Sequence, residues 1–259
     1  MTKLPKITFR LMTFIENMDL MAMFIHDELN QEDKANIIFF KDKYPEIKDI
    51  DFSKMTQEQI SDFLQSKLSI SWHEEMKSSD NIVNDFQSNW DQINDDVMRD
   101  LANRLNIDWP EDSLNILARV GIMAACPRYV EERVYDTYIY ADVARMRVTA
   151  IHEICHFLYF EKWQELLGNY WGEGCDNPHI VWLLSEAMID PLLNNDVFRK
   201  YTNAEIFSYD VFYNTMINDA SIIDYLREIV INKPIDEAIK DSYAFFMENQ
   251  QIINPNTHI

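Results

Sequence analysis

The sequence is poor in cysteine, and its few cysteines form no recognisable pattern. Cys126, Cys155 and Cys175 are the three cysteines of this 259-residue chain. Their odd number and their spacings match neither a disulfide framework nor a cysteine-type zinc site, and suit a reducing compartment. The first ten residues contain three basic side chains, but Glu16 and Asp19 interrupt the apolar stretch that follows, so no signal peptide is predicted. We therefore expect a cytoplasmic protein.

Long apolar runs and an excess of basic charge are also missing. No uncharged apolar run approaches the length of about 18 residues that a membrane span needs. The chain has 23 Lys and Arg against 44 Asp and Glu, and its formal net charge is −21. Such a charge repels nucleic-acid phosphates and anionic membrane surfaces, so neither is expected as a partner. Solubility is the simplest role of this charge; a preference for basic substrates would be a more specific role, which the sequence does not establish.

The remaining composition is typical of a soluble globular protein with a large core. Hydrophobic residues make up 47% of the chain and charged residues 26%, and there are only four glycines. We predict an α+β fold that is mostly α-helical, with residues 1–107 forming a helical N-terminal region. A capping-box sequence at Thr56 and apolar residues at helical spacing elsewhere support this prediction. The predicted helices of this region are about Thr8–Asn30, Gln31–Lys41, Thr56–Leu68 and Asn81–Leu105.

Residues 108–259 show strands first and helices after them. The segment 128–143 alternates and is rich in Tyr, Val and Ile, which predicts one or two strands after a first strand at Ser113–Gly121. A long helix should follow from about Asp142, its N-cap, to Leu167. Asn177-Pro178 predicts the start of another helix, which Pro191 ends or kinks. The last predicted helices are roughly Asn203–Asn218, Ser221–Ile231 and Ile235–Asn249.

The most informative motif is His152-Glu153-Ile154-Cys155-His156. Residues four apart lie on one face of a helix, so both imidazoles can bind one zinc ion and Glu153 can act on a zinc-bound water. The surrounding run from Val148 to Phe160 is otherwise largely apolar, so this helix should be buried. Buried ionisable side chains are costly unless they are satisfied, which favours a metal over ordinary core histidines.

A second segment begins in the same way but does not complete the motif. In His73-Glu74-Glu75-Met76-Lys77, a lysine occupies the position of the second histidine, and the surroundings are polar. A lysine at this position cannot complete the pair of imidazole ligands. We therefore interpret this segment as a solvated helix end or turn.

A catalytic zinc ion usually has three protein ligands and one open position, so a third ligand is needed. A glycine at position 159 and a histidine at position 162 would extend the motif, but Tyr159 and Lys162 stand there. The best candidate is Glu186, which lies in a strongly apolar predicted helix. Asp190 lies on the same helical face and could accept a hydrogen bond from a ligating histidine. Other acids that could provide the third ligand are Glu161, Glu165, Glu173 and Asp176.

The two segments resemble the gluzincin group of zinc metallopeptidases, of which thermolysin is the familiar member. That group has His-Glu-x-x-His on one helix and Asn-Glu-x-x-x-Asp on a later one, and this chain matches both with Ser185 in place of Asn, over residues 128–191. The resemblance implies a zincin-like metallopeptidase core within residues 108–259, with zinc as cofactor and a peptide or protein as substrate. It implies that zinc is bound by His152, His156 and Glu186.

The resemblance also implies roles for neighbouring residues. Glu153 would be the general base and acid that moves a proton from water to the leaving amine, and Asp190 would orient His152. An edge strand at about Tyr135–Ala141 would pair with the substrate backbone. His179, seven residues before Glu186, either faces the cleft as a transition-state donor or caps a helix. Two tyrosines of a predicted downstream helix are further donor candidates: Tyr213 and Tyr209.

Two alternative functions stay open at this point. The chain could be a catalytically silent zinc-binding regulatory or interaction protein on the same scaffold, which would contain the metal without turnover. It could also be a purely structural protein, whose motif helix binds no metal. Zinc content and peptide hydrolysis together distinguish these alternatives from a metallopeptidase.

Overall fold

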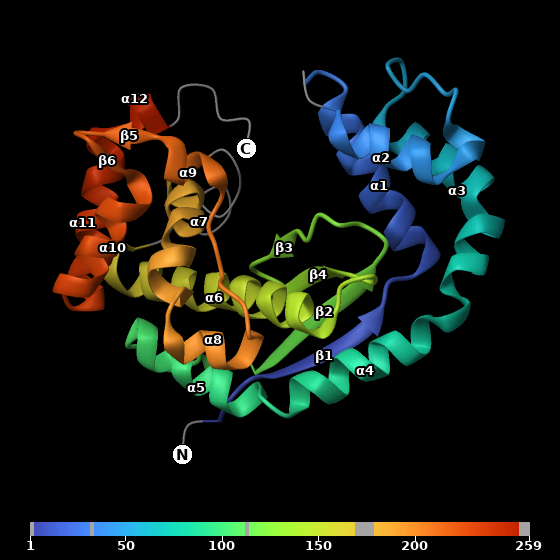
Figure 1. Ribbon diagram of the computed structural model, residues 1–259. Coiled ribbons are helices and arrows are strands. Elements are labelled where there is room, and N and C mark those ends of the chain that lie inside the picture. Colours follow the sequence, from blue (N-terminus) through green and yellow to red (C-terminus); the bar gives the residue numbers. More distant parts are fainter. Residues whose placement is uncertain (1–2, 32–33, 112–113, 169–178, 254–259) are drawn as a thin grey trace.

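A computed structural model describes residues 3–31, 34–111, 114–168 and 179–253. The strands of its main sheet are β1 (Lys6–Leu11), β2 (Asn115–Gly121), β3 (Arg128–Tyr129) and β4 (Val134–Tyr138). Their order is β1-β2-β4-β3; β1, β2 and β4 run parallel, and β3 runs antiparallel to β4. Helices make up most of the remaining structure (Figure 1). The predicted α+β class with a small mixed sheet is therefore confirmed.

The strand β1 corrects the prediction that the first hundred residues are all helical. Ile7 and Phe9 are buried while Thr8 between them is exposed, which is the two-residue period of a strand. β1 pairs along its whole length with β2, from Lys6 opposite Asn115 to Leu11 opposite Val120. Segments from both sides of the predicted boundary at residue 107 thus share one sheet.

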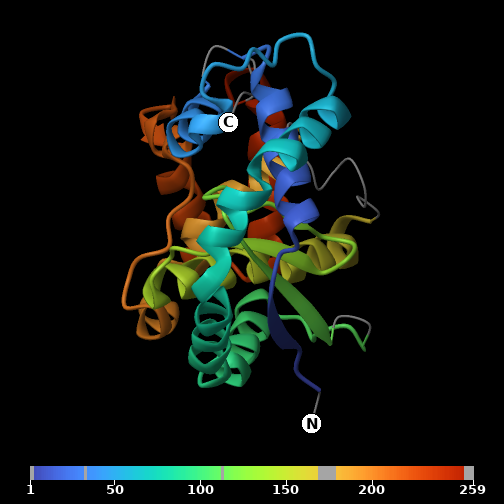
Figure 2. The same ribbon diagram turned by 90° about the vertical axis from the view of Figure 1, so that its right-hand side faces the viewer.

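Three helices follow β1 and lie above the sheet in Figures 1 and 2. They are α1 (Phe14–Glu28), α2 (Ala35–Lys43) and α3 (Gln57–Glu75), with a short 3-10 turn, η1 (Pro45–Ile47), after α2. Thr13 and Thr56 form capping boxes at the first residues of α1 and α3. The predicted helix at Thr56 is confirmed, and it continues to Glu75. His73 and Glu74 are exposed near its end, as expected for the incomplete motif.

The predicted helix over residues 81–105 is two helices, which is a correction. After the turn η2 (Met76–Ser78), α4 (Ser79–Asp91) and α5 (Asn94–Leu105) are separated at Ile93. The break places buried Asn94 where it accepts a hydrogen bond from Trp90 Nε1 and donates one to the Pro5 carbonyl. An uninterrupted amphipathic pattern does not reveal this interaction, because Pro5 lies far away in the sequence.

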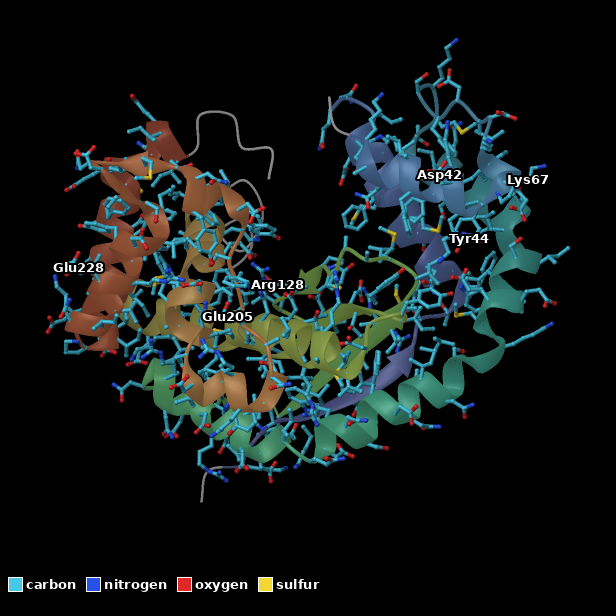
Figure 3. The ribbon with its side chains drawn as sticks, in the orientation of Figure 1. Asp42, Tyr44, Lys67, Arg128, Glu205 and Glu228 are labelled. Carbon is cyan, nitrogen blue, oxygen red and sulfur yellow. The ribbon has the colours of Figure 1, made fainter. Side chains whose placement is uncertain are left out.

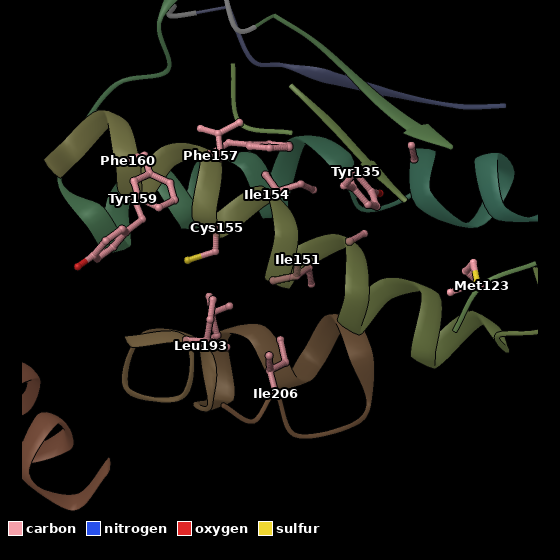
Figure 4. Packing of buried hydrophobic residues seen from close by; sticks show 14 of the residues in the cluster. Met123, Tyr135, Ile151, Ile154, Cys155, Phe157, Tyr159, Phe160, Leu193 and Ile206 are labelled. Atoms are coloured by element: carbon pink, nitrogen blue, oxygen red, sulfur yellow. The ribbon is translucent and has the colours of Figure 1, made fainter. Parts of the chain in front are cut away.

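The helix α6 (Val143–Leu167) carries the His-Glu-x-x-His motif through the centre of the molecule. Asp142 caps it by accepting a hydrogen bond from the backbone N–H of Arg145, as predicted. Figure 4 shows Phe157 of α6 directed towards the strands, whereas Cys155 is directed towards Leu193. Packing on both sides fixes the motif side chains on a rigid element.

The helix α7 (Ile180–Leu193) has His179 as its N-cap, and the predicted start at Asn177-Pro178 lies outside the described residues. The helix continues past Pro191, so of the two predicted alternatives the ending at Pro191 is wrong. Proline removes the N–H that would bond to the carbonyl of Ala187. The Ser208 hydroxyl donates to this carbonyl over 3.1 Å and accepts the N–H of Asp190 over 3.0 Å. Ser208 thus compensates for the proline within the helix.

The remaining segment contains α8 (Asp196–Thr202), α9 (Asp210–Asn214), the strands β5 (Met216–Ile217) and β6 (Ala220–Ser221), α10 (Ile222–Asn232), α11 (Ile235–Glu248) and α12 (Gln250–Ile253). The predicted helix Asn203–Asn218 is wrong, because α9 is short and a hairpin follows it. Asn218 and Asp219 both have positive φ, which fits the tight turn between β5 and β6. The last two predicted helices are confirmed as α10 and α11. No helix in the described ranges is long and apolar enough to cross a membrane.

Candidate metal centre

Three side chains predicted as zinc ligands converge between α6 and α7. One ligand atom from each of His152, His156 and Glu186 lies within 4.8 Å of the others. Oε2 of Glu186 lies 3.4 Å from Nε2 of His152 and 3.4 Å from Nε2 of His156. The two imidazole ring centroids are 4.9 Å apart. Glu186, which follows His156 by 30 positions in the chain, therefore presents its carboxylate to the same point as the two motif histidines.

These ligand atoms are buried and incompletely satisfied. His156 is 0% exposed and Glu186 is 1% exposed. Both ring nitrogens of His156 and Oε2 of Glu186 form no hydrogen bond among the described residues. Unsatisfied buried polar atoms are costly, and a metal ion bound at Nε2 and Oε2 would remove most of this cost. Two imidazole nitrogens and one carboxylate oxygen also form a common ligand set of catalytic zinc, so the residues fit the metal.

The pKa values of two ligands favour the forms that bind a metal. Burial lowers the pKa of His156 to about 3, so its imidazole is neutral near pH 7. Burial acts to raise the pKa of Glu186, but the permanent charge of the adjacent Arg128 guanidinium opposes it and helps to hold this pKa well below the usual range. His152 differs, because Glu153 and Glu186 outweigh the effect of burial and raise its pKa. The folded protein therefore holds the imidazolium proton of His152 more tightly than free histidine does, and a metal ion that binds at this nitrogen must displace it.

Glu153 lies beside the three ligands and also lines the adjoining pocket. It is 7% exposed, and its Oε2 forms no hydrogen bond among the described residues. Burial raises the pKa of Glu153 to about 7. A carboxyl group with a pKa near neutrality can both accept and donate a proton at physiological pH, as general acid–base chemistry requires.

Arg128 is the residue of this centre that the sequence did not indicate. Its Nη1 lies 2.6 Å from Oε1 of Glu186 and 3.7 Å from Oε2 of Glu153. Figure 3 shows Arg128 in the region between β3 and α7. Its side chain is 9% exposed, so the ion pair is largely shielded from water. No local pattern distinguishes Arg128 from the other arginines, because its partners lie on two distant helices.

The prediction that Asp190 orients His152 is wrong. The Asp190 carboxylate accepts hydrogen bonds from Arg227, from the Tyr213 hydroxyl at 2.7 Å and from Asn194 at 3.0 Å. Nε and Nη2 of Arg227 lie 2.6 and 2.9 Å from its two oxygens. Asp190 lies one helical turn beyond Glu186, about 6 Å further along the axis, and faces α10 there. It connects α7 with α10 instead of supporting a ligand.

The two predicted transition-state donors also have other roles. Tyr213 donates its hydroxyl hydrogen to Asp190 and accepts the Ser208 N–H, so it is not directed at the ligands. His179 caps α7, where its Nδ1 accepts the N–H of Val181 over 3.2 Å. Tyr209 is the tyrosine that lines the pocket together with His152 and Glu153.

Two of the other candidate acids are described by the structure, and neither joins the centre. Glu161 pairs with Arg133, and Glu165 pairs with Lys162. Glu173 and Asp176 lie outside the described residues. Glu186 is therefore the acid that meets the motif histidines among the residues that the structure describes.

A pocket of about 900 Å³ opens beside Glu153. Met23 and Phe24 of α1 line one side, and Trp182 and Tyr209 line the other. The prediction of an edge strand at Tyr135–Ala141 is wrong, because β4 lies between β2 and β3 in the sheet. β3 is the outer strand, and it carries Arg128 into the centre.

The arrangement combines a converging set of nitrogen and oxygen atoms that could bind a metal, a carboxyl group whose pKa is raised to about 7, and an adjoining pocket. These are the parts that metal-assisted hydrolysis needs. No family model, curated protein or solved structure matches this chain.

Proposed function

We propose that this chain is a zinc-dependent metallopeptidase of the gluzincin-like type, with a peptide or protein as substrate. One observation carries the proposal: His152, His156 and Glu186 converge within 4.8 Å beside a pocket that Glu153 also lines. A buried ligand set without a pocket would favour a structural metal, and a pocket without ligands would favour simple binding. Free thiols at Cys126 and Cys155 support a reducing, cytoplasmic location as part of the same proposal.

The proposed chemistry divides between the metal and this chain's residues. Zinc held by His152, His156 and Glu186 would polarise the scissile carbonyl and lower the pKa of a water molecule. Glu153 accepts a proton from water in the pocket and delivers it to the leaving amine. Its pKa of about 7 allows both steps near neutral pH.

Arg128 and Tyr209 have supporting roles in this proposal. Arg128 is a positioning residue, because it holds Oε1 of Glu186 while Oε2 faces the two histidines. Tyr209 replaces Tyr213 as the tyrosine that can donate a hydrogen bond to bound substrate. Burial raises the pKa of Tyr209, so its hydroxyl keeps its proton.

A second candidate function is a zinc-binding protein without turnover. The distance of 3.7 Å between Arg128 Nη1 and Glu153 Oε2 favours it, because a cation near the general base makes it a weaker base. The two candidate functions differ in whether Glu153 is basic enough to accept a proton from water. Its pKa is raised to about 7 despite the nearby Arg128, which favours the metallopeptidase.

Zinc content and peptide hydrolysis, measured on the same preparations, test the proposal. We expect about one zinc per chain in the purified protein, and hydrolysis of a pool of fluorogenic peptides. Glu153→Gln should retain the zinc and lose at least about a hundredfold in rate, the usual contribution of a general base. Glu165→Gln, on the same helix but paired with Lys162, should change neither quantity.

Each alternative predicts a different result from these measurements. Zinc binding without hydrolysis in the unmodified protein would favour the silent zinc protein. Absence of zinc binding would leave a purely structural helix. Undiminished hydrolysis by Glu153→Gln would refute its role as the base.

A further inference from the structure

The guanidinium group of Arg145 forms no hydrogen bond or ion pair within the part of the chain that the structure describes. It lines the same pocket as His152 and Glu153. Among the described residues, which include all ten arginines of the chain, it is the arginine whose side chain forms no hydrogen bond or ion pair. The nine arginines with partners are Arg10, Arg99, Arg104, Arg119, Arg128, Arg133, Arg147, Arg199 and Arg227. An unpaired arginine is unexpected in a chain with 44 acidic residues.

Helix stability does not account for this arginine. Arg145 lies in the first turn of α6, three residues after the N-cap Asp142. The positive end of the helix dipole is there, so acidic side chains are favoured and a cation is unfavourable. Arg145 is also exposed, so it fills no space in the core. Its placement therefore points to a function in the pocket.

Two arginines line the pocket, and Arg145 is the one without an ion pair among the described residues. Arg128 is already paired with Glu186. The acids that line the pocket are Glu153, beside the proposed ligands, and Asp27 of α1, whose carboxylate lies 4.0 Å from the neighbouring His26. Much of the remaining lining is apolar, with side chains such as Phe24 and Trp182. An anionic group is the natural partner of an unpaired guanidinium in such surroundings.

We propose that the pocket binds peptides with an Asp or Glu side chain that pairs with Arg145. Arg145 lies seven residues before His152, which is two turns on the same face of α6 and about 10 Å along its axis. An extended peptide advances about 3.3 Å per residue, so the acidic residue lies about three residues from the scissile bond. The cleavage position rests on the proposed function, whereas the binding of the acidic peptide does not.

A library of internally quenched octapeptides tests this specificity. Matched peptides carry Glu, Gln or Lys at each position on both sides of the cleaved bond, and kcat/KM is measured for each. At one position we expect kcat/KM of the Glu peptide to exceed that of the Gln peptide up to roughly fivefold, the upper end of what an exposed ion pair contributes. Arg145→Gln should abolish this ratio, and Arg145→Glu should invert it in favour of Lys. Arg99→Gln, an exposed arginine paired with Asp96, should leave the ratio unchanged.

A binding measurement separates this inference from the proposed function. The same peptides, labelled with a fluorophore, are titrated into the Glu153→Gln protein, and their Kd values are measured by anisotropy. Preferential binding of Glu peptides that Arg145→Gln abolishes supports the inference, even if no peptide is hydrolysed. A preference for Lys, equal binding of Glu and Gln peptides, failure of both to bind, or a Glu preference that Arg145→Gln leaves intact would each overturn it.

Discussion

Nη1 of Arg128 lies 2.6 Å from Oε1 of Glu186, while the other oxygen of this carboxylate faces His152 and His156 at 3.4 Å. One buried carboxylate is thus held by a permanent cation on one side and presented to two imidazoles on the other. The ion pair keeps Glu186 ionised and limits its rotation, which are two conditions for a good metal ligand. In the proposed metal centre, Arg128 would therefore be a positioning residue and not a ligand.

Replacing Arg128 should weaken zinc binding. Arg128→Met keeps an apolar stem of similar length but removes the ion pair, so we expect zinc affinity to fall about 10- to 100-fold. Competition with a chromogenic chelator measures this change. Arg133→Met is the matched control, because Arg133 is also buried and pairs with Glu161, away from the ligands. Equal zinc affinity of Arg128→Met and the unmodified protein would contradict the positioning role.

The stability of the zinc-free protein should depend on Glu153 at high pH. The pKa of Glu153 is raised by burial to about 7 in the folded protein, above its ordinary value of 4.5. The folded state therefore holds this proton more tightly than the unfolded state does. This contribution to stability is complete below about pH 4.5 and disappears as the pH rises through 7.

The substitution Glu153→Gln removes this pH dependence. Gln stays neutral at every pH, so the variant should be more stable than the unmodified protein at pH 8 by roughly 1–3 kcal/mol, with a smaller difference at pH 5. Urea unfolding of zinc-free samples at both pH values measures the difference. A stability difference that is the same at pH 5 and pH 8 would show that Glu153 does not titrate in this range.

His156 predicts the opposite dependence at acidic pH. Burial lowers its pKa to about 3 in the folded protein, below the ordinary value of 6.5. Its contribution to stability is therefore complete above about pH 6.5 and is lost as the pH falls towards 3. His156→Asn should lose less stability between pH 7 and pH 4.5 than the unmodified zinc-free protein, as measured by urea midpoints. Parallel pH profiles of the two proteins would count against a neutral buried imidazole.

Replacing Arg227 should lower the free energy of unfolding and leave zinc affinity nearly unchanged. Among the described residues, Arg227→Ala leaves Tyr213 and Asn194 as the side chains that donate hydrogen bonds to the buried Asp190 carboxylate. Because Arg227 is 39% exposed, solvent screens the pair, and we expect a loss of about 1–2 kcal/mol in the free energy of unfolding. Zinc affinity should stay within twofold. A large loss of zinc affinity with intact stability would instead return Asp190 to a role in supporting the ligands.

The residues of the candidate centre that could be predicted are those that the neighbouring sequence marks out. His152, Glu153 and His156 share one helical face, and Glu186 is conspicuous as an acid in an apolar helix. Asp190 has the same local signature, but its partner Arg227 lies 37 residues away on α10. Arg128 pairs with Glu186 across 58 residues, so no nearby residue indicates its role. Local patterns therefore identified the three side chains that converge, and they missed Arg128 and gave Asp190 the wrong partner.

The secondary structure could likewise be predicted where its signals are local, and not where distant contacts decide it. Capping residues and periodicity identified α3, α6, α10 and α11, because these signals lie within each helix. β1 was mistaken for part of a helix, since Phe9 and Leu11 precede α1 without a proline or glycine between them. The break between α4 and α5 depends on Asn94 and Pro5, which are distant in sequence. Such tertiary interactions decide where an element ends, and a local pattern does not contain them.

The pairing of β1 with β2 also constrains how the chain folds during synthesis. Lys6 pairs with Asn115, so the first strand has no neighbour in the sheet until more than a hundred further residues have left the ribosome. In that interval Ile7 and Phe9 are exposed on an unpaired strand edge, which favours association with other chains. Pairs so distant in sequence also slow folding. Nascent chains of this protein should therefore depend on chaperones until β2 has emerged.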